Sequence, residues 1–134
     1  MLKRAIAALA LAYATPAAAS EADWTYISTT NSGTVIHART ADLLKGRSDQ
    51  TVAPVWVRMD ASKDRSTGFK EAMILFAVNC VIRTQQQVQS TAYFRNGETQ
   101  RNGPTEPRFI VPESNMDTVA NLLCTDPAPE PNYR

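Results

Sequence analysis

Histidine and cysteine are scarce in this sequence, and their scarcity limits the chemistry that the chain can perform. The only histidine is His37, and the two cysteines, Cys80 and Cys124, stand far apart. Zinc sites and redox motifs place such residues at short spacings, and neither pattern occurs here. The G-x-S-x-G motif of a nucleophile elbow is also absent. We therefore predict no metal site, no cofactor and no enzymatic activity, and we interpret His37 as an ordinary strand residue.

Long apolar runs are absent except at the N-terminus, where one run has the layout of a secretory signal peptide. Two basic residues precede an apolar stretch over residues 5–13, and small residues follow, so that cleavage fits after Ala19 or Ser20. A membrane-spanning helix takes roughly 20 apolar residues, so this run is too short for an anchor. We predict a cleaved signal over residues 1–19 and export to the periplasm, with the cell surface or secretion as alternatives.

An excess of either charge is also missing. Removing Lys3 and Arg4 from the 14 basic residues leaves 12, against 13 acidic ones. A mature charge near −1 does not favour nucleic acid or anionic lipid as a partner. With no second long apolar run, no membrane insertion of the mature chain is expected.

The two cysteines gain a meaning from export, because thiols pair in an oxidising compartment. Only one pairing is available, Cys80 with Cys124. It would close a loop of about 45 residues and stabilise the fold by about 4 kcal/mol in the chain-entropy description. Two inert buried thiols are the alternative.

Strands dominate the remaining pattern. Alternating apolar and polar residues predict strands over residues 22–30, 34–40, 51–60, 69–84 and 88–94, followed by short extended pieces after Gly97 and over 107–112. The run from Ala72 to Val78 is apolar on both faces, which indicates a central strand. Asn96-Gly97 predicts a hairpin, and residues 41–50 are expected to form a loop with at most a helical turn. Pro54 is expected at a strand start or on an edge strand.

A helix is predicted after Ser114, whose side chain is a good N-cap, with Asp117 three residues later. The apolar residues Met116, Val119, Ala120 and Leu123 form one stripe on this helix. The stripe would lie on the sheet and bring Cys124 to Cys80. The predicted fold class is α+β, a predominantly antiparallel sheet with a C-terminal helix stapled to it by one disulfide. Residues 20–124 would form the domain and residues 125–134 a flexible Pro-rich tail.

Several segments together resemble the bacterial surface-adhesin E-like domain. They are Trp24 in the first strand, VWVRMD around Trp56, the apolar run into Cys80, TAYFRNGE, and FIVPES followed by a helix that ends in Cys124. The resemblance covers about residues 23–124. It implies an antiparallel sheet with a C-terminal helix, and its named member binds host matrix proteins such as vitronectin and laminin.

Candidate binding residues come from the aromatic and polar strand positions. Trp56 alternates with the apolar set of its strand and shares a face with Arg58, and exposed aromatic and arginine side chains favour recognition. Tyr93 belongs to an aromatic strand, and Arg83, Gln85, Gln87 and Gln89 are expected on the wet side of the sheet. The acids Asp60, Asp64 and Glu71 are interpreted as a solvated hairpin loop rather than as a catalytic pair.

The sequence thus predicts an exported, non-enzymatic binding or accessory domain with a host or envelope protein as ligand. A periplasmic inhibitor or protective factor directed at a secreted hydrolase is the alternative.

Overall fold

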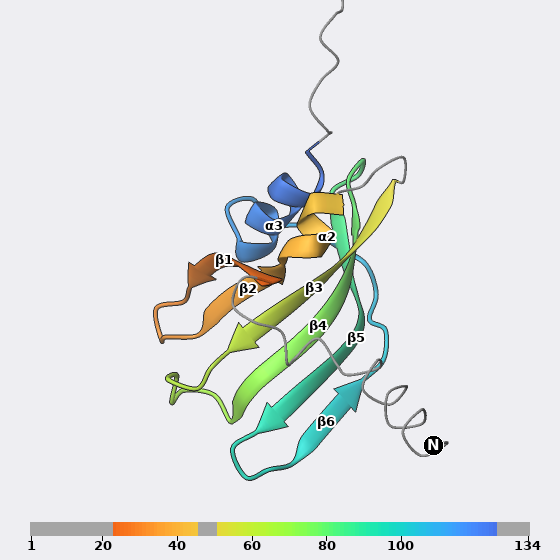
Figure 1. Cartoon of the computed structure of the whole chain (residues 1–134). Coiled ribbons are helices and arrows are strands. Elements are labelled where there is room, and N and C mark those ends of the chain that lie inside the picture. The colour runs from red at the N-terminus through yellow and green to blue at the C-terminus, as the bar shows by residue number, and fades with distance from the viewer. Residues whose placement is uncertain (1–22, 46–50, 126–134) are drawn as a thin grey trace, which may run out of the picture.

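An antiparallel meander with both helices on one side forms the structure, a computed structural model that describes residues 23–45 and 51–125 (Figure 1). Six strands lie side by side in chain order, and the short seventh strand pairs with β5 beyond the end of β6. The elements are β1 (Trp24–Thr29), β2 (Val35–Arg39), α2 (Thr40–Lys45), β3 (Val52–Asp60), β4 (Phe69–Asn79), β5 (Thr84–Phe94), β6 (Thr99–Asn102), β7 (Arg108–Phe109) and α3 (Asn115–Leu123).

The predicted fold class is confirmed. The sheet is antiparallel throughout, α3 follows the last strand, and the disulfide joins the end of β4 to the end of α3. The segment expected to be mainly a loop begins with the six-residue helix α2. The predicted signal over 1–19 and the tail after Thr125 lie outside the described residues.

The core lies between one face of the sheet and α3. Val55 and Val57 from β3, with Ile74, Phe76 and Val78 from β4, face the helix and are buried. From α3, Val119, Ala120 and Leu123 pack against them, which confirms the predicted apolar stripe. Burying one such side chain contributes about 1.5–3 kcal/mol, so these contacts account for much of the attachment of α3.

Pro54 is the third residue of β3 and lies ahead of the residues that pair with β2, in agreement with the expected position at a strand start or on an unpaired edge. The backbone N–H of Trp56, two residues on, donates to the Asp42 carboxylate of α2 at 2.8 Å. Because residues of the same parity point their N–H groups to the same side, the missing N–H of Pro54 also faces away from β4. β2 pairs with β3 only from Val57 to Asp60, so the proline removes no ladder hydrogen bond.

A bulge in β5 corrects the predicted wet side of the sheet. Phe76 is paired with Gln87, but the neighbouring Leu75 is paired with Gln89, so Val88 is an extra residue in the strand. The inserted residue reverses the alternation. Gln87 therefore shares the helix side of the sheet with Gln85, while Gln89 lies on the opposite face, and the prediction of one common face was wrong.

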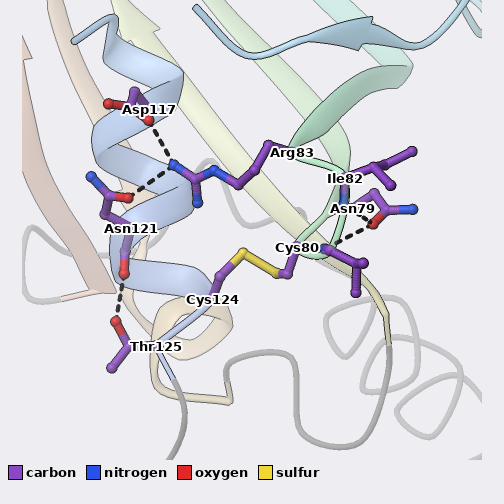
Figure 2. The surroundings of a disulfide bond; sticks show 9 residues. Asn79, Cys80, Ile82, Arg83, Asp117, Asn121, Cys124 and Thr125 are labelled. Atoms are coloured by element: carbon purple, nitrogen blue, oxygen red, sulfur yellow. Dashed lines mark hydrogen bonds and ion pairs between the residues drawn. A yellow bond between two sulfur atoms is a disulfide. The ribbon is translucent and has the colours of Figure 1, made fainter. Parts of the chain in front are cut away.

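Two groups of interactions fasten α3 to the end of β4 (Figure 2). The Cys80–Cys124 disulfide has a Cα–Cα distance of 5.5 Å, which confirms the predicted pairing. The guanidinium of Arg83 donates to the carboxylate of Asp117 at 2.6 Å and to the side-chain oxygen of Asn121 at 2.9 Å. At the start of α3, Ser114 Oγ accepts from the backbone N–H of Asp117 at 3.2 Å, as predicted.

The other end of β4 is held by hydrogen bonds around a buried carboxylate. Asp64, only 1% exposed, accepts from Ser32 Oγ at 2.8 Å, from Thr34 Oγ1 at 2.5 Å, and from both the N–H and the hydroxyl of Ser66. These bonds, above all those from the side chains of Ser66 and Thr34, hold the pKa of Asp64 well below its usual range. The interpretation of Asp64 as part of a solvated loop was therefore wrong.

Arg95, in the turn between β5 and β6, links a third turn of the sheet to this end of β4. Its guanidinium donates to the carbonyl oxygens of Ala61 at 2.7 Å and of Asp64 at 2.6 Å. The predicted hairpin at Asn96-Gly97 is present, with the N–H of Phe94 bonded to the carbonyl of Glu98 at 2.8 Å and a positive φ at Gly97. The turns β1–β2, β3–β4 and β5–β6 are thus tied together without any covalent bond.

Candidate binding face of the sheet

The face of the sheet opposite α2 and α3, here called the open face, carries a mixed set of aromatic, cationic and apolar side chains. Strand register places one row across it in the order Tyr26, His37, Arg58, Met73, Thr91, Arg101. A second row runs from Trp56 through Leu75 to Gln89. Neither described helix packs on this face, because the buried residues of α3 all belong to the core on the other side.

Trp56 and Arg58 lie on the open face because successive side chains of β3 point to opposite faces of the sheet. Val55 and Val57 occupy the core, so the residues between and after them project to the other side. Both Trp56 and Arg58 are half-buried. This confirms the predicted division of β3 into an apolar face and an aromatic–polar face.

Arg58 sits at the centre of the open face and is held there by two neighbours. Its guanidinium carbon lies 5.9 Å from the centre of the Trp24 ring, within the range of a cation–π contact. Its Nε lies 3.6 Å from a carboxylate oxygen of Glu71 on β4. The side chains of Arg58 and Glu71 remain 19% and 28% exposed, so the pair is accessible to a partner.

Trp24 is buried on this face, with 5% of its surface exposed. Its ring covers part of the sheet, as expected for a core-like tryptophan, although it lies on the side away from α3. The indole Nε1 has no hydrogen-bond partner within the described part of the chain. Trp24 therefore supplies a platform for Arg58 rather than a polar contact of its own.

Aromatic side chains flank this centre on both sides. Tyr26 on β1 is 59% exposed, and its ring contacts the ring of His37 edge-on at a centroid distance of 6.0 Å. On the other side, Tyr93 of β5 lies opposite Glu71 in the register and is half-buried. These tyrosines give the open face a border with both apolar surface and hydroxyl groups.

Asp60 lies on the same face at the end of β3. Burial raises the pKa of this carboxyl group, but hydrogen bonds from Ser62 and electrostatic interactions with Arg58 and His37 outweigh burial and lower the pKa below its usual range. Asp60 is therefore ionised at neutral pH, and the open face presents both signs of charge.

Three of the four candidate binding residues share the open face, and one does not. Trp56, Arg58 and Tyr93 lie on it, whereas Arg83 lies in the turn between β4 and β5 with a φ of 58°. The Arg83 guanidinium is engaged by α3, as Figure 2 shows. Its place in the structure is that of an anchor for the helix.

Sequence reasoning missed Tyr26, His37 and Met73 as neighbours of Arg58. The signal that would have found them is the strand register, since residues on four strands meet in this row. Register depends on turn lengths and on the bulges in β1, β4 and β5, which no local pattern marks.

Both cysteines form the disulfide, so neither supplies a thiolate. Within residues 23–45 and 51–125, no group of three or more His, Cys, Asp or Glu side chains is placed to hold a metal ion. In the same ranges, no helix has both the length and the apolar character needed to cross a membrane.

Comparison with known proteins identified no relative. No family model matches this chain, and neither a curated protein nor a solved structure matches it at the level of significance applied.

Proposed function

We propose that this protein is an exported, non-enzymatic binding domain that recognises a protein ligand through the open face of its sheet. The single observation that carries the proposal is the row through Arg58, in which tyrosine, histidine and arginine side chains meet beside the buried Met73 on a face that no described helix covers. Tryptophan, tyrosine, methionine and arginine are the residue types enriched at protein–protein interfaces.

The electrostatics of the open face support a protein ligand over a polyanion. Arg58 is balanced by Glu71, and Asp60 adds a second negative charge beside His37. Such a mixed surface complements another mixed surface, whereas nucleic acid requires a predominantly basic one. The resemblance to surface-adhesin E-like domains supports the same class of ligand, and export is supported by the disulfide, which is typical of oxidising compartments.

Photo-crosslinking in producing cells tests this proposal, because it captures a ligand whose identity is still open. A photoreactive amino acid would replace Tyr26 or Gln89, both exposed on the open face, and in matched controls Leu44 of α2 or Leu122 of α3, both exposed elsewhere. We expect a discrete adduct from the two open-face positions and none from the two helix positions. Protease treatment should reduce the adduct to the size of a short peptide attachment, because the ligand is a protein.

Three results would count against the proposal: no adduct from either open-face position, equal adducts from the helix positions, or an adduct whose added mass resists proteases, which would indicate a glycan. Protease shaving of intact cells then assigns the compartment. A shaved protein with an intact periplasmic control indicates a surface adhesin, and binding to vitronectin or laminin would be measured next. A protected protein directs the search to periplasmic partners.

A further inference from the structure

A small hollow lies on the helix side of the sheet, beside the edge formed by β5 and β7. It is separate from the open face, because Gln85 and Gln87 of β5 pair with the core residues Val78 and Phe76. Its lining consists of Phe76, Gln85, Gln87, Thr105, Glu106 and Arg108, and its volume is about 190 Å³. Sites for drug-sized ligands enclose roughly 300–1,000 Å³, so only a smaller molecule fits here.

The outer wall of the hollow is fixed by hydrogen bonds to β5. The N–H of Thr105 donates to the carbonyl of Gln87 at 2.9 Å, and the N–H of Gln87 donates to Thr105 Oγ1 at 3.2 Å. The side chain of Gln86 donates to the carbonyl of Thr105 at 2.8 Å. Further along, Arg108 is the register partner of Gln85, and the buried Ile110 anchors the segment in the core. The wall is therefore formed before any ligand arrives.

Two opposite charges stand side by side on that wall. Glu106 and Arg108, on either side of Pro107, both line the hollow, and the residue before a proline favours an extended backbone. Neither has a hydrogen bond or ion pair to another residue within the described ranges, and the same holds for the side-chain amides of Gln85 and Gln87. An acid, a base and two amides thus face the hollow with their hydrogen-bonding capacity unused.

We propose that this hollow binds a small zwitterion of the α-amino-acid class with an apolar side chain. The α-carboxylate pairs with the Arg108 guanidinium and the α-ammonium with the Glu106 carboxylate, two charge-assisted hydrogen-bonding contacts of the stronger kind. The amides of Gln85 and Gln87 each offer a donor and an acceptor, and they orient the two ends of the ligand. The apolar side chain lies on Phe76 at the base of the hollow.

This site is independent of the proposed protein-binding function, since it uses the other face of the sheet. A neutral sugar would use the amides but would leave both charges of the wall without a charged partner. An amino acid matches each of these groups, and for this reason the amino acid is the favoured class.

Calorimetric titration of the intact protein with L-leucine tests the proposal. We expect saturable one-to-one binding, and at least about tenfold weaker binding in Arg108→Gln and in Glu106→Gln, because each change removes one charge-assisted contact. Arg65→Gln and Glu98→Gln are matched controls, because both residues are exposed and lie outside the hollow. They should bind leucine as the unchanged protein does. Circular dichroism would establish that all four variants are folded.

Blocked ligands separate a zwitterion site from a general apolar pocket. N-acetyl-leucine lacks the ammonium and leucinamide lacks the carboxylate, so each should bind at least about tenfold more weakly than leucine. The proposal is overturned if leucine and a panel of other apolar amino acids show no saturable binding, if the blocked forms bind as well as leucine, or if the control variants lose binding equally. Binding of a monosaccharide in place of every amino acid would also overturn it.

Discussion

The two ends of β4 are held by different physical means. Beyond its last residue, Cys80 forms the disulfide with α3, and apolar contacts of Leu123 reinforce the attachment. Before its first residue, the buried carboxylate of Asp64 accepts hydrogen bonds from the β1–β2 turn and from its own loop, and Arg95 binds the backbone carbonyls there. The first end combines a covalent bond, apolar contacts and the Arg83–Asp117 ion pair, whereas the second has hydrogen bonds only.

This difference shows that one sheet can respond to two separate conditions at its two ends. A disulfide is insensitive to pH but is broken by reductants. A carboxylate with a lowered pKa is insensitive to reductants but loses its hydrogen-bonded anionic form in acid. Changes made at one end at a time reveal whether the two ends respond independently.

Removal of the disulfide should have the largest effect. The double change Cys80→Ala with Cys124→Ala removes a cross-link between residues that are 44 positions apart in the sequence. The free energy of unfolding should therefore fall by about 4 kcal/mol. Urea denaturation at neutral pH measures it. Treatment of the unchanged protein with dithiothreitol should give a similar loss.

The pH dependence of the same double variant tests whether the two ends of β4 respond independently. The acid sensitivity that Asp64 confers, measured as the difference between the protein with Asp64 and its Asp64→Asn variant, should be the same with and without the disulfide, since Asp64 is far from it along β4. If that difference changes when the disulfide is removed, the two ends are coupled. Equal urea midpoints for the oxidised and reduced protein would contradict the role given to the cross-link.

Asp64→Asn should have the next largest effect. The amide replaces one accepting oxygen with a donor, so at least one of the hydroxyls of Ser32, Thr34 and Ser66 loses its buried acceptor. The melting temperature at neutral pH should fall by several degrees. Differential scanning calorimetry measures it, with Glu98→Gln, an exposed acid, as the control expected to remain unchanged.

Lowering the pH should remove the stabilising contribution of the same carboxylate. The folded-state pKa of Asp64 is lowered, so its stabilising contribution is present above the ordinary value of 3.8 and is lost as the pH falls below it. Asp117, whose pKa is lowered by the backbone N–H of Glu113 and by Arg83, changes in the same direction. The unchanged protein should therefore lose melting temperature below about pH 4, and Asp64→Asn should lose less. Parallel curves for the two proteins would contradict this assignment.

Ser114→Ala should have the smallest effect of the three. It removes the side chain that accepts the N–H of Asp117 at the start of α3, which costs about 1 kcal/mol in typical helices. Urea denaturation of the oxidised protein measures this loss. Thr118→Ala, an exposed change in the same helix, is the control and should not destabilise the protein.

The fold followed from the sequence wherever a local pattern carries the information. Period-two alternation located β3 and β4 and assigned their faces, although β4 ends at Asn79 and not at the predicted residue 84, and Ser114 with the stripe through Leu123 located α3. A unique cysteine pair gave the long-range connection. These features need only the residues within one element, or a single allowed pairing.

Features that depend on tertiary context were not predictable in the same way. The bulge at Val88 moves Gln85 and Gln87 to the helix side, and no residue there distinguishes a bulged strand from a regular one. The burial of Asp64 could not be predicted locally, because its partners Ser32 and Thr34 come from another hairpin. The Asp-x-Ser turn with Ser66 was the only local signal. Among the candidate binding residues, Arg83 lies away from the open face and contacts α3. Strand alternation carries no information about that contact.

The position of Cys124 in the chain also sets an order of events. Cys124 follows all seven described strands, so the bond to Cys80 cannot form until synthesis has passed every one of them. Each of β1 to β6 can pair with a sequence neighbour as it emerges, with only short loops to close. By contrast, the hydrogen bond of 2.5 Å between Ser28 of β1 and Asn115 of α3 joins residues that are 87 positions apart in the sequence, so it cannot form until α3 has been synthesised. A molecule that carries the intramolecular disulfide has therefore been synthesised at least through α3.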